Sequence, residues 1–161
     1  ANMHWGLEYE RIPSREQREL ADWLMRQGVD LVIGSHPHVV QPMVLRRGKE
    51  GVPDRLVVYS LGNFISNMSR EHTDGGVMVK VVLGRKGLRR YIASAQYSLI
   101  YSSRYKNEQG KEDIRVVPAA SWSGKNQNSS FSVDSALIKY VNNTRLFLKG
   151  NNKEVEEYIF E

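Results

Sequence analysis

Two histidines flank a proline in the segment Gly34-Ser35-His36-Pro37-His38, directly after a short apolar run at residues 29–33. The run is rich in β-branched residues, which predicts a strand buried on both faces of a parallel sheet. Ligands of α/β proteins usually bind beyond the carboxyl ends of such strands. Pro37 fixes its own φ and favours an extended backbone at His36, so the loop would present two imidazoles to a metal ion. For this motif alone, a surface loop that holds two histidines by chance is an equal alternative.

Other polar residues are expected at the same edge of the sheet. His4 ends an opening strand, Glu8 follows four residues later, and Asn63 comes after the next buried strand. Because parallel strands bring their carboxyl ends together, we expect His4, His36 and His38 to gather at one rim. Imidazole nitrogens with carboxylate or amide oxygens suit zinc, manganese or iron. The alternatives are solvated histidines and an asparagine that caps a turn.

The intervening sequence predicts the elements that would position these residues. Ser14 and Gln17 have capping-box spacing, and apolar residues at helical intervals follow, so we expect a helix over 14–27. His72 lies in a polar loop, and we interpret it as a solvated side chain. The remaining elements are predicted from apolar runs and turn residues: strands over 41–45, 56–60, 77–83, 89–101 and 114–117, a turn over 84–87 within a hairpin, a loop over 121–132, and helices over 135–148 and 153–160.

The composition is that of one globular domain. The chain has 161 residues, of which 40% are hydrophobic and 25% charged. It contains no cysteine, which excludes disulfides and thiolate metal sites. The net charge of +5 favours anionic partners, but the basic residues are not interleaved with aromatic ones, so nucleic acid is not expected. No apolar run approaches the ~20 residues that a membrane helix needs.

Several motifs occur together in the order and spacing of one known pattern. They resemble the capsule-biosynthesis CapA family, also described as poly-γ-glutamate biosynthesis proteins, over residues 1–83. That family is similar to the calcineurin-like metallophosphoesterases. The main matching segments are His4-Trp5-Gly6-x-Glu8-Tyr9, Gly28-Val29-Asp30, Gly34-Ser35-His36-Pro37-His38-Val39-Val40-Gln41-Pro42 and Tyr59-Ser60-Leu61-Gly62-Asn63-Phe64.

The resemblance implies an α/β fold, part of a four-layer α/β/β/α sandwich of mixed sheets with a two-metal site at one edge. His4 matches the lone histidine of the metallophosphoesterase pattern. His36 and His38 match its final pair, although Ser35 departs from the expected Gly-His-x-His. The pattern's early aspartates, including the carboxylate that bridges the two metals, precede the lone histidine, where this sequence has three residues.

We therefore expect a carboxyl-terminal part of a longer protein, a single partial domain over 1–161 that lacks its amino-terminal half. Residues 1–83 would form the core with the histidine motifs, and 84–161 the hairpin, late strand and final helices. Without the bridging carboxylate we expect at most one weakly held ion or none, and an inactive piece. Its exposed apolar face would favour a homodimer.

Two functions of the parent protein stay open at this point. The first is a metal-dependent, phosphoesterase-like hydrolase with His4, His36 and His38 as ligands. Glu8 would then be an acid/base or ligand-supporting residue, and Asn63 an orienting or substrate-binding group. The second is a non-catalytic module that binds an anionic polymer such as poly-γ-glutamate during assembly or export. A domain whose chemistry has decayed is a third. The resemblance also implies a bacterial cell-envelope location and membrane association of the parent protein.

Overall fold

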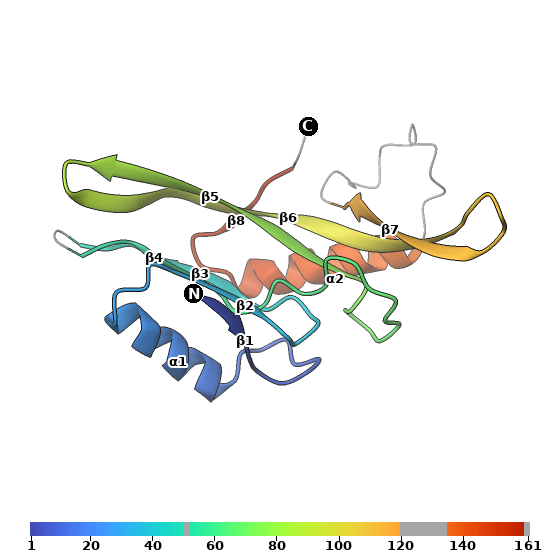
Figure 1. The fold of residues 1–161 in the computed structure, drawn as a ribbon, viewed down its shortest axis with the longest axis horizontal. Coiled ribbons are helices and arrows are strands. Elements are labelled where there is room, and N and C mark those ends of the chain that lie inside the picture. Colours follow the sequence, from blue (N-terminus) through green and yellow to red (C-terminus); the bar gives the residue numbers. More distant parts are fainter. Residues whose placement is uncertain (50–51, 120–134, 160–161) are drawn as a thin grey trace.

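The computed structural model describes residues 1–49, 52–119 and 135–159. These residues form two helices and eight strands (Figure 1). In chain order they are β1 (Asn2–His4), α1 (Arg15–Arg26), β2 (Leu31–Ser35), β3 (Met43–Arg46), β4 (Arg55–Val58), β5 (Gly75–Lys86), β6 (Arg89–Lys106), β7 (Glu112–Pro118), α2 (Ser135–Asn151) and β8 (Glu156–Glu157).

The first sheet has the strand order β1-β2-β4-β3. Strands β1, β2 and β4 are parallel, and β3 joins β4 in the antiparallel direction. The register places His4 opposite Ser35, so the ends of β1 and β2 meet at one edge. The parallel arrangement expected from the spacing of the histidines is therefore confirmed.

The second sheet is built on the long strand β6. Its neighbours β5 and β7 are antiparallel to it, and the short β8 pairs with it in the parallel direction. The predicted hairpin between β5 and β6 is confirmed, but its turn is tighter than expected. The strands continue to Lys86 and resume at Arg89, which leaves Gly87 and Leu88 as a two-residue turn with a φ of +61° at the glycine.

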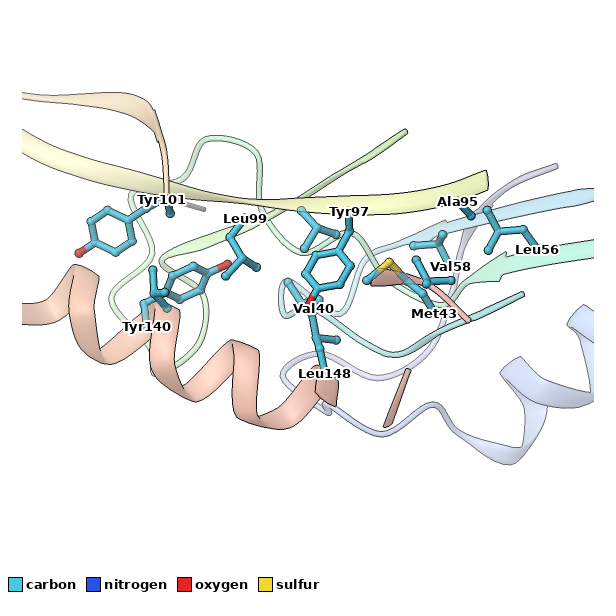
Figure 2. Packing of buried hydrophobic residues seen from close by; sticks show 14 of the residues in the cluster. Val40, Met43, Leu56, Val58, Ala95, Tyr97, Leu99, Tyr101, Tyr140 and Leu148 are labelled. Carbon is cyan, nitrogen blue, oxygen red and sulfur yellow. The ribbon is translucent and has the colours of Figure 1, made fainter. Parts of the chain in front are cut away.

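The first sheet is covered on both faces (Figure 1). On one face it packs against α1 through a cluster that includes Trp5, Ala21 and Val57. On the other face it packs against the second sheet, and α2 lies beside it under β6 and β7. Figure 2 shows this larger core, in which side chains of β6 contact both β4 and α2. The α/β class with mixed sheets is confirmed, whereas the four-layer sandwich implied by the resemblance is not.

Helix α1 begins as the capping box predicts. The Ser14 hydroxyl accepts the backbone N–H of Gln17 at 3.2 Å, and the Gln17 side chain accepts the backbone N–H of Ser14 at 2.9 Å. Gln17 is buried and donates to the Gln41 side chain at 2.8 Å. This bond ties the start of α1 to the segment that follows the histidine loop.

The helix predicted over 135–148 is confirmed as α2, but the one over 153–160 is wrong for its described part. Lys153 instead exchanges backbone hydrogen bonds with Met43 and Leu45, and residues 156–157 form β8. Pairing with exposed strand edges outweighs the weak helical preference of this charged segment. The predicted loop over 121–132 lies outside the described residues. Among the residues that are described, no helix is long and apolar enough to cross a membrane.

Candidate metal centre

The loop after β2 is held by backbone hydrogen bonds from two neighbouring segments. The N–H of Trp5 donates to Ser35 at 3.2 Å, and the N–H of Tyr9 donates to Pro37 at 2.8 Å. From the other side, the N–H of Leu61 donates to Gly34 at 3.0 Å. The loop that carries His36 and His38 is therefore fixed by the segments after β1 and β4.

The backbone of this loop differs from the sequence-based expectation. His36 has a φ of +99° and His38 a φ of +60°, so the extended conformation expected at His36 is wrong. Tyr9, which bonds to the loop, also has a positive φ, of +69°. Such conformations cost side-chain-bearing residues about 1–3 kcal/mol each and persist only where the surroundings enforce them. Here the hydrogen bonds to neighbouring segments outweigh the local effect of Pro37 on His36.

The structure brings the three histidines of the motif to one rim. The ring centroids of His4 and His36 are 4.5 Å apart, and those of His36 and His38 are 6.2 Å apart. Residues more than thirty positions apart in the chain therefore meet here, because β1 and β2 end at the same edge of the sheet. Their assignment as metal ligands remains a prediction.

The donor atoms closest to one another come from Glu8, His36 and His38. One atom from each lies within 4.8 Å of the other two. The Glu8 carboxylate is 3.9 Å from Nε2 of His38. His4 does not belong to this group, although its ring contacts that of His36. In the structure Glu8, rather than His4, therefore lies in the donor group with His36 and His38. The sequence analysis had expected His4 in that position.

Asn63 determines which nitrogen of His38 faces this group. The Asn63 amide nitrogen donates to the carbonyl of Thr73 at 3.0 Å, so its oxygen is the atom that faces the histidine. That oxygen lies 3.0 Å from Nδ1 of His38, which must therefore be the protonated nitrogen that donates to it. In the neutral ring this leaves the lone pair on Nε2, directed toward Glu8, as metal-bound histidines require.

An arginine lies beside the same group. The Tyr9 ring stacks on that of His38 with centroids 6.2 Å apart, and the Arg70 guanidinium carbon lies 4.0 Å from the Tyr9 ring centroid. Within the described part of the chain, the Arg70 side chain has no acidic partner. Sequence reasoning missed Arg70, because it lies in a polar loop that only the tertiary fold carries to the histidines.

His72 lies outside the donor group. It lines a separate hollow against α2, together with Glu71, Lys139 and Tyr140. The side chain is partly buried rather than fully solvated as expected, and this desolvation, with the nearby Arg11, lowers its pKa.

The fold and the rim together define an α/β protein with a histidine–carboxylate group at the carboxyl edge of a mixed sheet. Residues 1–68 match the family model described as bacterial capsule synthesis protein PGA_cap. The PGA biosynthesis protein CapA of Bacillus subtilis (strain 168) is 34% identical over 88 residues, which are 55% of this chain and 22% of that protein. The capsule biosynthesis protein CapA of Bacillus anthracis is 36% identical over 86 residues, 53% of this chain and 20% of the relative. No solved structure matches the chain.

These matches confirm the resemblance to the CapA capsule-biosynthesis proteins that the sequence motifs indicated, and they place it in the amino-terminal part of the chain. The aligned segment spans about a fifth of the length of both curated relatives.

Proposed function

We propose that the chain belongs to a capsule-polymer biosynthesis protein of the bacterial cell envelope, that it holds one divalent ion, zinc, manganese or iron, and that the full-length protein uses this site to hydrolyse a phosphoester. The observation that carries the proposal is the group of Glu8, His36 and His38. Two histidines and one carboxylate are a donor set of catalytic zinc sites, in which the fourth position stays open for water or substrate.

The geometry fits one ion after small side-chain movements. Ligand atoms ~2 Å from a tetrahedral ion lie roughly 3.5 Å from one another. The three donor atoms already lie within 4.8 Å, and their side chains are exposed or partly buried, so they can close by rotation. A bound ion would act as a Lewis acid and lower the pKa of a water molecule at the open position.

The neighbouring residues have distinct roles in this proposal. Asn63 keeps Nε2 of His38 unprotonated and aimed at the ion, while Tyr9 supports the ring by stacking. Arg70, resting on Tyr9, would attract the negative charge of the substrate close to the rim. A guanidinium without an acidic partner is well suited to a phosphate or carboxylate group.

A second candidate is a non-catalytic module that binds an anionic polymer. Arg70 and the net charge of +5 favour it, as does the similarity to the PGA biosynthesis protein CapA of Bacillus subtilis. In this case the histidine rim would serve binding rather than turnover.

Metal binding is the first test. We expect equilibrium dialysis against zinc and manganese to show one ion per chain, with affinity lowered at least about tenfold in Glu8→Gln and His38→Ala. The matched controls are Glu10→Gln and His72→Ala, which remove the same chemical groups outside the donor group. Wild-type affinity in both Glu8→Gln and His38→Ala would refute the assigned site.

Turnover separates the two candidates. The metal-loaded chain and a full-length CapA relative would be assayed with bis(p-nitrophenyl) phosphate and, separately, for binding of poly-γ-glutamate. Metal-dependent hydrolysis that Glu8→Gln abolishes supports the hydrolase. Salt-sensitive polymer binding without hydrolysis in any divalent ion supports the binding module instead.

A further inference from the structure

The hairpin between β5 and β6 has an exposed apolar tip that the proposed function does not use. Leu88, in the two-residue turn, is 93% exposed, and Leu83 is 64% exposed. Val82 and Tyr91 are exposed on the same hairpin. Single apolar side chains on a surface are ordinary, but a group of them on one projecting element marks an interaction surface.

The same tip is strongly basic. Four exposed basic residues flank the turn: Arg85, Lys86, Arg89 and Arg90. They lie in two cross-strand pairs, Arg85 opposite Arg90 and Lys86 opposite Arg89. The sequence has no acidic residue from 75 to 107. Like charges directly opposite one another destabilise a hairpin. A negatively charged partner bound at the tip would reduce this repulsion.

Contacts with the described part of the protein neutralise only some of this positive charge. Arg90 lies 3.6 Å from Asp30, yet its side chain remains 74% exposed. Arg89 donates to the carbonyl of Gly48 at 3.5 Å, and no acidic partner for it lies among the residues that the structure describes. Most of the positive charge around Leu88 is therefore accessible to a partner.

The tip is separate from the candidate metal centre. Its contacts with Asp30 and Gly48 place it near the amino ends of β2 and β4, whereas the histidine rim lies at the carboxyl edge of the same sheet. In Figure 1 the hairpin turn lies at the opposite side of the molecule from β7. A partner at the tip would leave the rim accessible.

We propose that residues 85–90 dock the protein on an anionic lipid surface. Leu88 inserts among the headgroups, and the four basic side chains contact lipid phosphates. A lipid surface matches both properties of the tip, because it offers negative charge and, directly beneath, an apolar layer for the leucine. A soluble polyanion would match the charge and leave Leu88 without a partner.

Vesicle co-sedimentation tests this proposal without any metal, so its result is independent of the proposed hydrolase. We expect the chain to bind phosphatidylglycerol/phosphatidylcholine vesicles in a salt-sensitive manner and phosphatidylcholine vesicles much more weakly. Each basic residue near the surface contributes about fivefold to binding, so Arg85→Ser/Arg89→Ser should lose roughly twenty-five-fold. Leu88→Ser should lose about tenfold, from lost apolar burial.

The turn region between β6 and β7 supplies the matched control. Lys106→Ser/Lys111→Ser removes the same number of charges from the other exposed hairpin and should bind vesicles like the wild type. Because the chain has no cysteine, Leu88→Cys and Gln109→Cys can each carry one environment-sensitive fluorophore. Only the label at position 88 should report an apolar surrounding on anionic vesicles.

Three results would overturn the proposal. One is equal binding to neutral and anionic vesicles, and another is equal loss in the tip and control double variants. The third is unchanged vesicle binding by Leu88→Ser together with full competition by poly-γ-glutamate, which would assign the tip to a soluble polyanion.

Discussion

At the scale of single residues, the candidate site depends on the side chains that fix the tautomer of His38. Asn63 is held by Thr73 and in turn holds His38, so the lone pair of Nε2 faces Glu8. The sequence predicted Asn63 at this edge from its position after a buried strand. It did not predict Arg70, because no local pattern links a loop arginine to the ring of Tyr9.

Replacing Asn63 should weaken the metal site without removing a ligand. We expect Asn63→Ala to lower zinc affinity about 10–100-fold, since His38 loses the partner that sets its tautomer and ring orientation. Isothermal titration with zinc measures this. Asn67→Ala, an exposed residue of the following loop, is the control, and equal affinity of the two variants would contradict the role of Asn63.

Replacing Arg70 should weaken anion binding at the rim. A hydrogen bond to a charged group contributes about 1.5–3 kcal/mol, so Arg70→Ala should lower affinity for inorganic phosphate or poly-γ-glutamate at least about tenfold. Arg15→Ala, on the exposed side of α1, removes the same charge and should have little effect. An identical loss in both variants would assign the effect to net charge rather than to this position.

At the scale of elements, the close approach of β2 to its neighbours positions the histidine loop. The indole N–H of Trp5 donates to the carbonyl of Tyr59 at 2.8 Å, directly beside Gly34. A Cβ at Gly34 would lie 2.0 Å from that carbonyl oxygen and 2.4 Å from the indole nitrogen. Only glycine allows the segments after β1 and β4 to meet across β2.

We expect Gly34→Ala to destabilise the protein by about 3 kcal/mol, because the obstructing atoms are backbone and a buried ring. Urea unfolding followed by circular dichroism measures the loss. Gly150→Ala is the control: nothing lies within 4 Å of its Cβ position, and alanine there should be neutral or stabilise α2 by up to about 1 kcal/mol. A Gly34→Ala variant as stable as Gly150→Ala would refute the argument from packing.

At the scale of the whole molecule, a buried carboxylate helps to join the two sheets. Asp54, just before β4, accepts the N–H of Gly48 at 2.8 Å, the N–H of Ile92 on β6 at 3.0 Å and the Arg47 guanidinium at 3.1 Å. Burial by itself would raise the pKa of Asp54, but these three donors outweigh it and hold the pKa below its usual value. The folded protein therefore favours the ionised form more strongly than the unfolded chain does.

The sign of the pH dependence follows from this lowered pKa. The stabilisation by Asp54 is fully present above the unfolded pKa of about 4 and is lost as the pH falls below that value through the folded pKa. We expect Asp54→Asn to cost roughly 2–3 kcal/mol at neutral pH and to flatten the loss of stability in acid. Urea unfolding over a pH series, with the exposed Glu108→Gln as control, measures both effects. An unchanged acid slope in Asp54→Asn would contradict them.

The sequence by itself determined α1, α2, the β5–β6 hairpin and the edge at which the histidines meet. These features depend on local signals: capping by Ser14, the apolar run before Gly34 and the polar residues at strand ends. Parallel pairing of the strands then brings the polar residues together at one rim. Tertiary structure decided the rest: the positive φ of His36, the place of Glu8 in the donor group and the strand pairing of residues 156–157. Each of these depends on partners distant in the chain, whose hydrogen bonds and packing outweigh local backbone preferences.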